Sequence, residues 1–194
     1  MKGIYLAACR ARHNNFDLDY NDIDNKYNCN VIGNMINVDL TKYDYIIATP
    51  PCNYYSRCNY RRNTSKYSLS TKHLLPTILE KLSQLNKPFI VENVRNAPLY
   101  EKLGIYDIAR KYNLHVQIVG RHTYFTNTFI NLECEQQIDF HNKNTRKKYN
   151  LKFMEDSYRQ GGINVHNVIE IWLNYVNNNI VKNKKICYEQ LCLF

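Results

Sequence analysis

The chain has 194 residues, a formal net charge of +9 and 44% hydrophobic residues. This length favours a single globular domain, and no apolar stretch approaches the roughly 20 residues that a membrane span needs. Polar and basic residues follow the short apolar start, where a secretory signal would show a cleavage site, so we expect a cytoplasmic protein. The positive charge suits a polyanionic partner, because Lys and Arg that neutralise phosphates release counterions.

The seven cysteines are odd in number and form no C-x-x-C pair, so we expect neither a metal site nor a redox dithiol. Most of them are expected to be small buried side chains in a reducing compartment. Cys52 is the exception because of the residues around it. The cysteines stand at positions 9, 29, 52, 58, 134, 187 and 192.

Residues 43–48 are a short apolar run that ends at Pro50, and they predict a buried strand. Downstream, helical spacing and apolar runs predict a helix over 73–85, a strand over 87–94, a helix over 100–112 and a strand over 114–119. This alternation predicts an α/β fold, with a mostly parallel sheet flanked by helices.

Only 42 residues precede the first of these strands, too few for three further strands with their helices. We therefore expect a sheet that is reduced at the N-terminus. Residues 128–152 are polar, with basic residues at 146–148, and predict either a solvated loop or a phosphate-contacting loop. A helix is predicted over 165–176, so we expect one domain over 1–176 and a flexible tail over 177–194.

Two reactive side chains follow neighbouring strands. Pro50 and Pro51 restrict the backbone before Cys52, so the thiol is held with little freedom. Glu92 ends an apolar strand, where partial desolvation favours the neutral carboxylic acid. Ligands bind beyond the carboxyl ends of parallel strands, so both groups are expected at one rim. There the acid can bind N3 of a pyrimidine while the thiolate adds to C6, which makes C5 nucleophilic.

Four motifs in this order resemble those of the DNA cytosine-5 methyltransferases. They are ATPPCNYYS (48–56), FIVENV (89–94), GRHTYFTN (120–127) and YRQGGINVHNVIEIW (158–172). The resemblance implies a class I methyltransferase-like, Rossmann-like fold and a target base that is flipped out of the duplex.

The resemblance also implies a role for each matched residue. Cys52 would be the nucleophile, Glu92 the partner of N3, and Arg121 the residue that orients the site or the base. Asn93 would brace the cysteine loop, with a simple turn residue as the alternative; for Glu92 alone, a strand-end ion pair is the alternative. The residues implied to support the pocket are Pro50, Pro51, Ser56, Asn93, Val94 and Thr123.

The methyl donor of this family is S-adenosylmethionine, and the resemblance implies Asp39, Asn164 and Val165 as donor-binding residues. The family's glycine turn, Phe-x-Gly-x-Gly, has no counterpart among the six glycines of this chain. Thr123 replaces the second arginine of the Arg-x-Arg motif, and Ile163 stands where the closing motif has Asn. The family's long target-recognition segment is a short loop here, so weak sequence discrimination is expected.

The C-terminal residues Gln190, Leu191, Leu193 and Phe194 resemble the Gln-Leu-x-Leu-Phe peptide that docks bacterial proteins on the DNA polymerase sliding clamp. A flexible segment with apolar anchors suits such a pocket. The alternative is that Leu191 and Phe194 cover the domain's own core. Clamp attachment would raise the local concentration of DNA without base readout.

The sequence therefore predicts an enzyme that modifies C5 of cytosine in DNA, most simply by methylation, in the nucleoid of a bacterium or in a phage-infected cell. One alternative is a split or degenerate methyltransferase, completed by a second subunit or using another electrophile without S-adenosylmethionine. The other is a clamp-associated DNA-binding or inhibitory protein.

Overall fold

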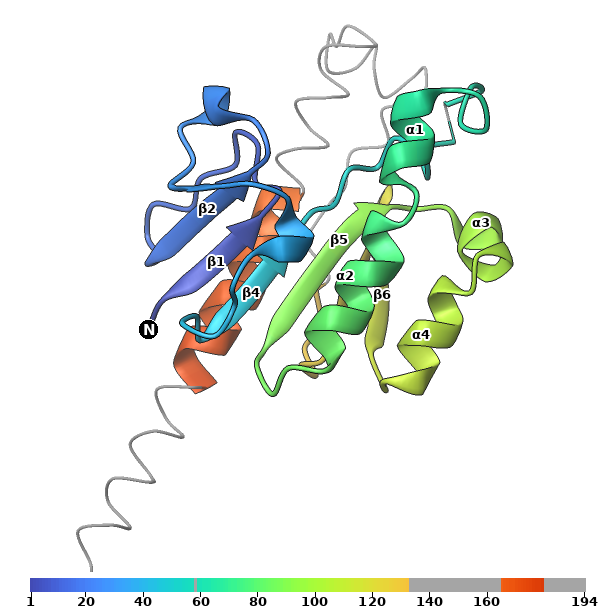
Figure 1. The fold of residues 1–194 in the computed structure, drawn as a ribbon. Helices are drawn as coiled ribbons and strands as arrows, with labels where there is room; N and C mark the ends of the chain where they lie inside the picture. The colour runs from blue at the N-terminus through green and yellow to red at the C-terminus, as the bar shows by residue number, and fades with distance from the viewer. Residues whose placement is uncertain (58, 133–164, 180–194) are drawn as a thin grey trace, which may run out of the picture.

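A computed structural model of the chain describes residues 1–57, 59–132 and 165–179, and its strands form one seven-stranded sheet in the order β3-β2-β1-β4-β5-β7-β6 (Figure 1). The pairs from β3 to β5 are parallel, whereas β7 is antiparallel to both β5 and β6. The predicted α/β class and mostly parallel sheet are confirmed. The strands are β1 (Gly3–Leu6), β2 (Leu18–Asp22), β3 (Val31–Ile32), β4 (Tyr45–Ala48), β5 (Phe89–Val94), β6 (His115–Val119) and β7 (His122–Thr126).

Helices cover both faces of the sheet (Figure 1). The described α-helices are α1 (Lys66–Thr71), α2 (Leu74–Ser83), α3 (Ala97–Lys102), α4 (Ile105–Lys111) and a helix over 165–179. The apolar side of α2 packs on one face through Leu75, Ile78 and Leu82. The helix over 165–179 packs on the other face, with Ile169 and Trp172 fully buried. The strands between these layers are therefore buried on both sides, as their continuous apolar runs predict.

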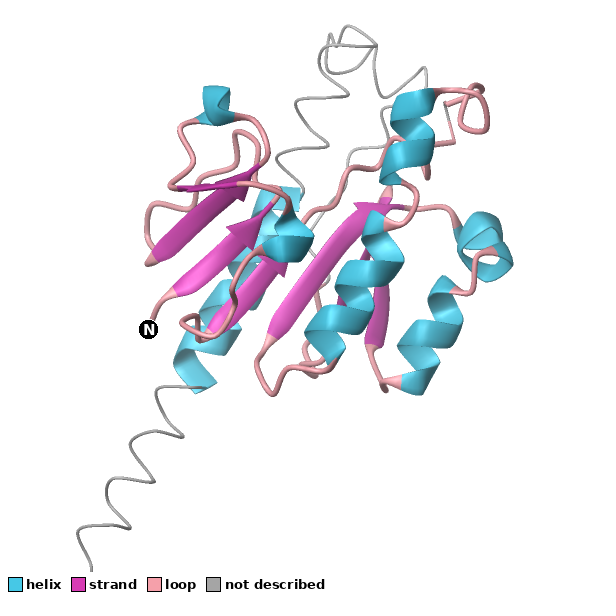
Figure 2. Cartoon of the chain, in the orientation of Figure 1, coloured by secondary structure: helices cyan, strands magenta, loops and turns pink. Residues whose placement is uncertain are grey.

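The upstream region differs from the prediction. Residues 1–42 hold three strands and no α-helix, so the stretch has room for the strands, and only their helices are missing, as its length led us to expect. What is reduced is the connections: they contain the 3-10 helices Asn25–Tyr27 and Met35–Asn37 and are otherwise mostly loop (Figure 2). Gly3 permits close packing here, because a β-carbon would lie 2.1 Å from the ring of Tyr45.

Two further elements differ from the sequence prediction. The helix expected over 100–112 is two short helices, α3 and α4, because Gly104 between them adopts a left-handed conformation with φ +67°. Strand β7 was not predicted. It follows β6 through a tight hairpin in which Gly120, with φ +58°, takes the positive φ that such turns need.

The helix predicted over 165–176 is present and extends to residue 179, three residues beyond the expected domain boundary. Its indole anchor is Trp172, whose Nε1 donates to Thr128 Oγ1 at 2.8 Å and to Thr126 Oγ1 at 3.2 Å. Among the helices in the described ranges, none combines the length and apolar character needed to span a bilayer.

Candidate active site

The carboxyl ends of β4 and β5 bring Cys52 and Glu92 to the same rim of the sheet. The two strands pair in parallel, with Ala48 opposite Val91. Cys52 follows Ala48 after a short loop, and Glu92 is the residue next to Val91. The placement expected from the sequence is thus what the register of these strands produces.

The loop before Cys52 is held by hydrogen bonds to its neighbours. Thr49 donates from its backbone N to Leu6 O at 3.1 Å and from Oγ1 to Ala7 O at 3.0 Å, so the loop is fixed to the end of β1. Asn93 Nδ2 donates to Pro50 O at 2.9 Å, and Asn93 is only 1% exposed. This is the bracing contact that the resemblance implied for Asn93.

The chain after Cys52 begins a helical turn. The carbonyl of Cys52 accepts from the backbone N of Tyr55 at 2.9 Å and of Ser56 at 2.8 Å. Asn96 Nδ2 donates to Tyr55 O at 2.6 Å, and an Arg62 guanidinium N donates to Ser56 O at 2.9 Å. Side chains from β5 and from downstream therefore fix the backbone on both sides of the cysteine.

The Cys52 residue is exposed at the rim. The pKa of its thiol is nevertheless raised above the ordinary value, first because the surrounding protein desolvates the thiolate and second because the Glu92 carboxylate repels it. The two groups are therefore close enough to interact electrostatically. A charged Glu92 opposes formation of the thiolate, and neutralisation of that carboxylate favours it.

Glu92 has a partner that the sequence did not predict. Its Oε1 lies 2.5 Å from Nδ1 of His122, and the two side chains are 12% and 16% exposed. Both project from one face of the sheet, because Glu92 pairs with Tyr124, two residues beyond His122. The alternative role considered for Glu92, a strand-end ion pair, therefore also has a partner at this site, His122. Only the antiparallel register of β7 makes the contact, so no local sequence signal could have revealed it.

The other residues expected around the pocket are divided by the sheet. Arg121 is exposed at the same rim, where its carbonyl accepts from the backbone N of Arg95 at 2.7 Å. Thr123 is fully buried and pairs with Asn93, so its side chain lies on the face opposite Glu92 and does not line a pocket with it. Val94 and Ser56 are half-buried near this rim.

The turn after β1 lies at the point where the strand order reverses, between β1 and β4. Ala7 has φ +54° and Cys9 has φ +50°, a left-handed conformation that normally favours glycine. Tyr5-x-Ala7-x-Cys9 has the spacing of Phe-x-Gly-x-Gly. Ala7 and Cys9 thus stand at the two glycine positions of that motif and adopt the left-handed conformation, although neither is glycine. The backbone N of Cys9 donates to Asp22 Oδ2 at 3.0 Å, which ties the turn to the end of β2.

Of the residues implied for donor binding, the structure describes Asp39 and Val165, and the hydrogen bonds of Asp39 are made away from this turn. Asp39 is exposed, and its Oδ1 accepts from the backbone N and Oγ1 of Thr41 at 2.9 and 2.8 Å. The adjacent segment contacts Lys87, just before β5, through the carbonyl of Thr41 at 2.7 Å. Val165 is the first described residue of the C-terminal helix and is half-buried.

A basic segment surrounds the cysteine loop. Residues 50–72 contain five Lys and Arg residues and no acidic residue. Arg57 and Arg61 are exposed, and between them Tyr60 is 97% exposed. Exposed cations and an aromatic ring are the groups that contact phosphates and bases. Sequence motifs alone do not single out this segment, because Lys, Arg and Tyr are abundant throughout the chain.

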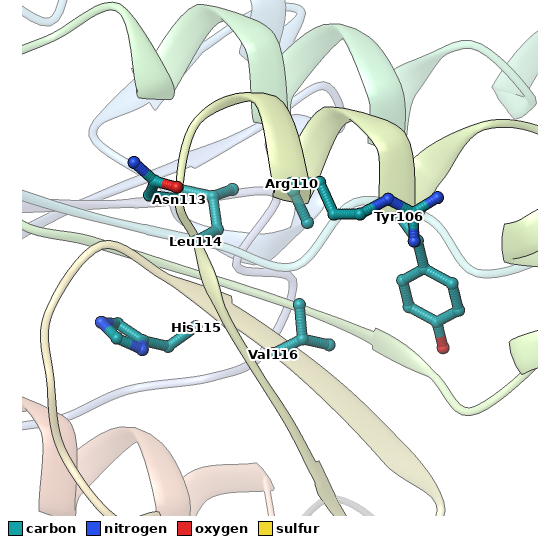
Figure 3. Close-up of a pocket in the computed structure, with 7 residues that line it drawn as sticks. Tyr106, Arg110, Asn113, Leu114, His115 and Val116 are labelled. Atoms are coloured by element: carbon teal, nitrogen blue, oxygen red, sulfur yellow. The ribbon is translucent and has the colours of Figure 1, made fainter.

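A hollow of about 500 Å³ lies elsewhere, between the end of α4 and the start of β6 (Figure 3). Arg110, His115 and Val116 are among its lining residues. Since β6 runs in the same direction as β5, the start of β6 is at the opposite edge of the sheet from Cys52. This hollow is separate from the candidate site.

The expectation of buried cysteines is confirmed for Cys29 and wrong for Cys9, which is exposed in the turn after β1. Several predicted features lie outside the described residues: the basic residues 146–148, the closing motif before residue 165 with Asn164, and the C-terminal peptide with Gln190, Leu191, Leu193 and Phe194.

Comparison with protein-family models gives no match for this chain, and comparison with curated proteins gives none either.

Proposed function

We propose that the protein modifies C5 of cytosine in DNA, most simply by methylation, through covalent addition of Cys52 to C6 of a flipped base. The observation that carries this proposal is the meeting of the Cys52 thiol and the Glu92 carboxyl group at one rim, where the charge of Glu92 acts on the thiol. Neither group alone would support the proposal, because an exposed thiol or a strand-end carboxylate is common in proteins of other functions.

The geometry supports a definite sequence of steps. As the base binds, Glu92 takes a proton from solvent water and donates it to N3 of the cytosine, so the carboxylate charge that helps to raise the thiol pKa is removed and the Cys52 thiol loses its own proton to water. The thiolate then forms a bond to C6 while the C5–C6 double bond breaks, and its electron pair makes C5 nucleophilic. C5 then bonds the electrophile, whose leaving group departs with the electron pair of the broken bond. Water removes the C5 proton, the C5–H electrons re-form the C5–C6 double bond, the S–C6 bond breaks to release the Cys52 thiolate, and the N3 proton returns to Glu92.

His122 extends this arrangement. Its contact with Glu92 Oε1 orients the carboxylate, so that the other oxygen remains for the base. We assign His122 as a positioning residue for Glu92. The buried contact between Asn93 and Pro50 has the corresponding role for the cysteine loop.

Two features favour DNA and a methyltransferase-like site over a small-molecule enzyme. The exposed cations Arg57, Arg61, Arg95 and Arg121 lie in loops that flank the rim, where the phosphates of a bound strand would run. The order of the seven strands, with β7 alone reversed, is also the order of the class I methyltransferase sheet.

S-adenosylmethionine, when bound, supplies an electrophilic methyl group. The backbone of the turn over Ala7 and Cys9 fits such a donor, because both residues are left-handed at the switch point, although neither is glycine. The backbone of this turn and the Asp22 carboxylate at the end of β2 are the groups that would hold it.

The proposal is tested by incubating DNA with the full chain and S-adenosylmethionine and analysing the nucleosides by mass spectrometry. We expect 5-methylcytosine with the wild type and with Cys29→Ala, a control at the buried cysteine between β2 and β3, and none with Cys52→Ser. Product formation that persists in Cys52→Ser would refute the proposed nucleophile.

A second candidate is C5 chemistry with a different electrophile or with a partner that completes the donor site. The observation in its favour is that both Asp22 oxygens are already engaged, Oδ2 by Cys9 N and Oδ1 by Asp24 N at 3.1 Å. Calorimetric titration of S-adenosylmethionine, with and without DNA, separates the two. Binding favours methylation by this chain, and no binding favours the second candidate.

A further inference from the structure

A cluster of three metal-ligating side chains lies on the face covered by the C-terminal helix. His13 comes from the loop between β1 and β2, whereas His166 and Glu170 are one turn apart on the helix over 165–179. One ligand atom from each lies within 4.8 Å of the others. Because the helix places residues four apart on one side, His166 and Glu170 both face His13.

The central residue of this cluster is buried without hydrogen bonds. His13 is 1% exposed, and neither ring nitrogen has a hydrogen-bond partner among the described residues. Glu170 Oε1 lies 3.5 Å from His13 Nδ1, too far for a good hydrogen bond, and 3.0 Å from His166 Nε2. A buried polar atom without a partner is costly, so a ligand that satisfies it would stabilise this arrangement.

The backbone and ring of His13 are held in place from the other side. Its backbone N donates to Tyr20 Oη at 2.7 Å, and its ring stacks on Tyr5 with centroids 5.8 Å apart. These two contacts therefore fix the imidazole of His13 beside His166 and Glu170.

From these contacts we infer that His13, His166 and Glu170 bind one divalent transition-metal ion, of which zinc is the best fit. Two imidazoles and one carboxylate favour zinc and its first-row neighbours over magnesium or calcium, which prefer oxygen ligands. Three protein ligands leave the fourth tetrahedral position for water. The ion joins the loop after β1, which carries the strained turn, to the C-terminal helix.

Metal binding requires one local movement. The rings of His13 and His166 are now parallel, with centroids 4.1 Å apart and an angle of 7° between planes, so their lone pairs lie in separate planes. Nitrogen ligands must converge on the ion at about 2.0–2.1 Å. The side chain of His166 is 39% exposed and can turn toward the shared position, whereas His13 is fixed by its contacts.

The test is a titration of the metal-free full chain with zinc, followed by calorimetry and by the imidazole NMR signals, with cobalt as a second probe. Cobalt distinguishes this site from the cysteines, because thiolate ligands add an intense charge-transfer band. We expect one ion per chain without that band, perturbed His13 and His166 signals, and affinity more than about tenfold weaker in His166→Gln and in Glu170→Gln.

Both variants replace half-exposed side chains, so the fold should be retained, and circular dichroism checks this. The matched control is His73→Gln, which changes an exposed histidine outside the cluster and should leave zinc affinity unchanged. Absence of binding, binding through thiolates alone, or equal affinity in His166→Gln, Glu170→Gln and the wild type would each overturn the inference.

Discussion

Replacing Cys9 by glycine should stabilise the protein, although the substitution removes a side chain. Cys9 has φ +50°, and this left-handed conformation costs an L-residue roughly 1–2 kcal/mol. Glycine avoids that cost but loses about 0.5–1 kcal/mol more conformational entropy on folding. Cys9 is exposed, so little packing is lost. The net expectation for Cys9→Gly is a gain of about 0.5–1 kcal/mol in the free energy of unfolding.

Urea unfolding followed by circular dichroism measures this difference under reducing conditions. Arg10→Gly is the matched control: Arg10 is also exposed and adjacent, but its φ is not positive. The control should lose about 0.5–1 kcal/mol, so the two substitutions should have opposite signs. If Cys9→Gly destabilises the protein as much as Arg10→Gly does, the turn after β1 is not left-handed at Cys9 and its likeness to a glycine turn is refuted.

Three further predictions concern the site and the metal cluster. Asn93→Ala should lower the free energy of unfolding in urea by about 1–3 kcal/mol, because Pro50 O loses its buried donor; an unchanged midpoint would contradict the bracing role. Glu92→Gln should lower the pKa of Cys52, because it removes the carboxylate charge that, after desolvation, raises the thiol pKa. Iodoacetamide should then alkylate Cys52 faster at neutral pH, and an unchanged or slower rate would count against the proximity of Cys52 and Glu92. In the metal-free native protein the pKa of His13 is lowered to about 4, whereas in the unfolded chain it is about 6.5. Between these pH values only the unfolded chain binds a proton at His13, so the contribution of His13 to the free energy of unfolding should fall by ~3 kcal/mol as the pH drops from about 6.5 to about 4. His13→Gln should flatten this pH dependence, and an identical profile would show that another group causes it.

Much of the central sheet could be predicted because its signals are local. The strand at 43–48, the helix at 73–85 and the strand at 87–94 correspond to β4, α2 and β5, whose residues are apolar over short runs or at helical spacing. Parallel strands place their carboxyl ends together, so the positions of Cys52 and Glu92 followed from the order of these elements.

Strand β2 could not be predicted because its buried residues are partly polar. In β2, Asp19 is buried and accepts from Tyr43 Oη at 2.8 Å and pairs with Lys2 at 2.9 Å. Asn21 is fully buried and donates to the carbonyls of Val31 and of Gly33, at 3.0 Å each. Their partners come from other strands and loops, so the sequence of β2 alone resembles a polar loop.

The same limit applies to the histidines. His122 contacts Glu92 only because β7 reverses direction after the hairpin with β6 and pairs antiparallel with β5. His13 meets His166 only because the C-terminal helix covers the start of the sheet. Contacts between positions 30 or more residues apart leave no periodic trace in one sequence.

The most direct test of the proposed function is covalent capture of Cys52 by DNA in which every cytosine carries fluorine at C5. Addition and transfer can proceed on such a base, but loss of the group at C5 cannot, so the S–C6 bond should persist. With S-adenosylmethionine present, we predict a protein–DNA complex that survives denaturing electrophoresis in the wild type and in Cys29→Ala and disappears in Cys52→Ser. A wild-type protein that forms no such complex, or a complex that survives in Cys52→Ser, would contradict attack by Cys52 on cytosine with transfer of a methyl group.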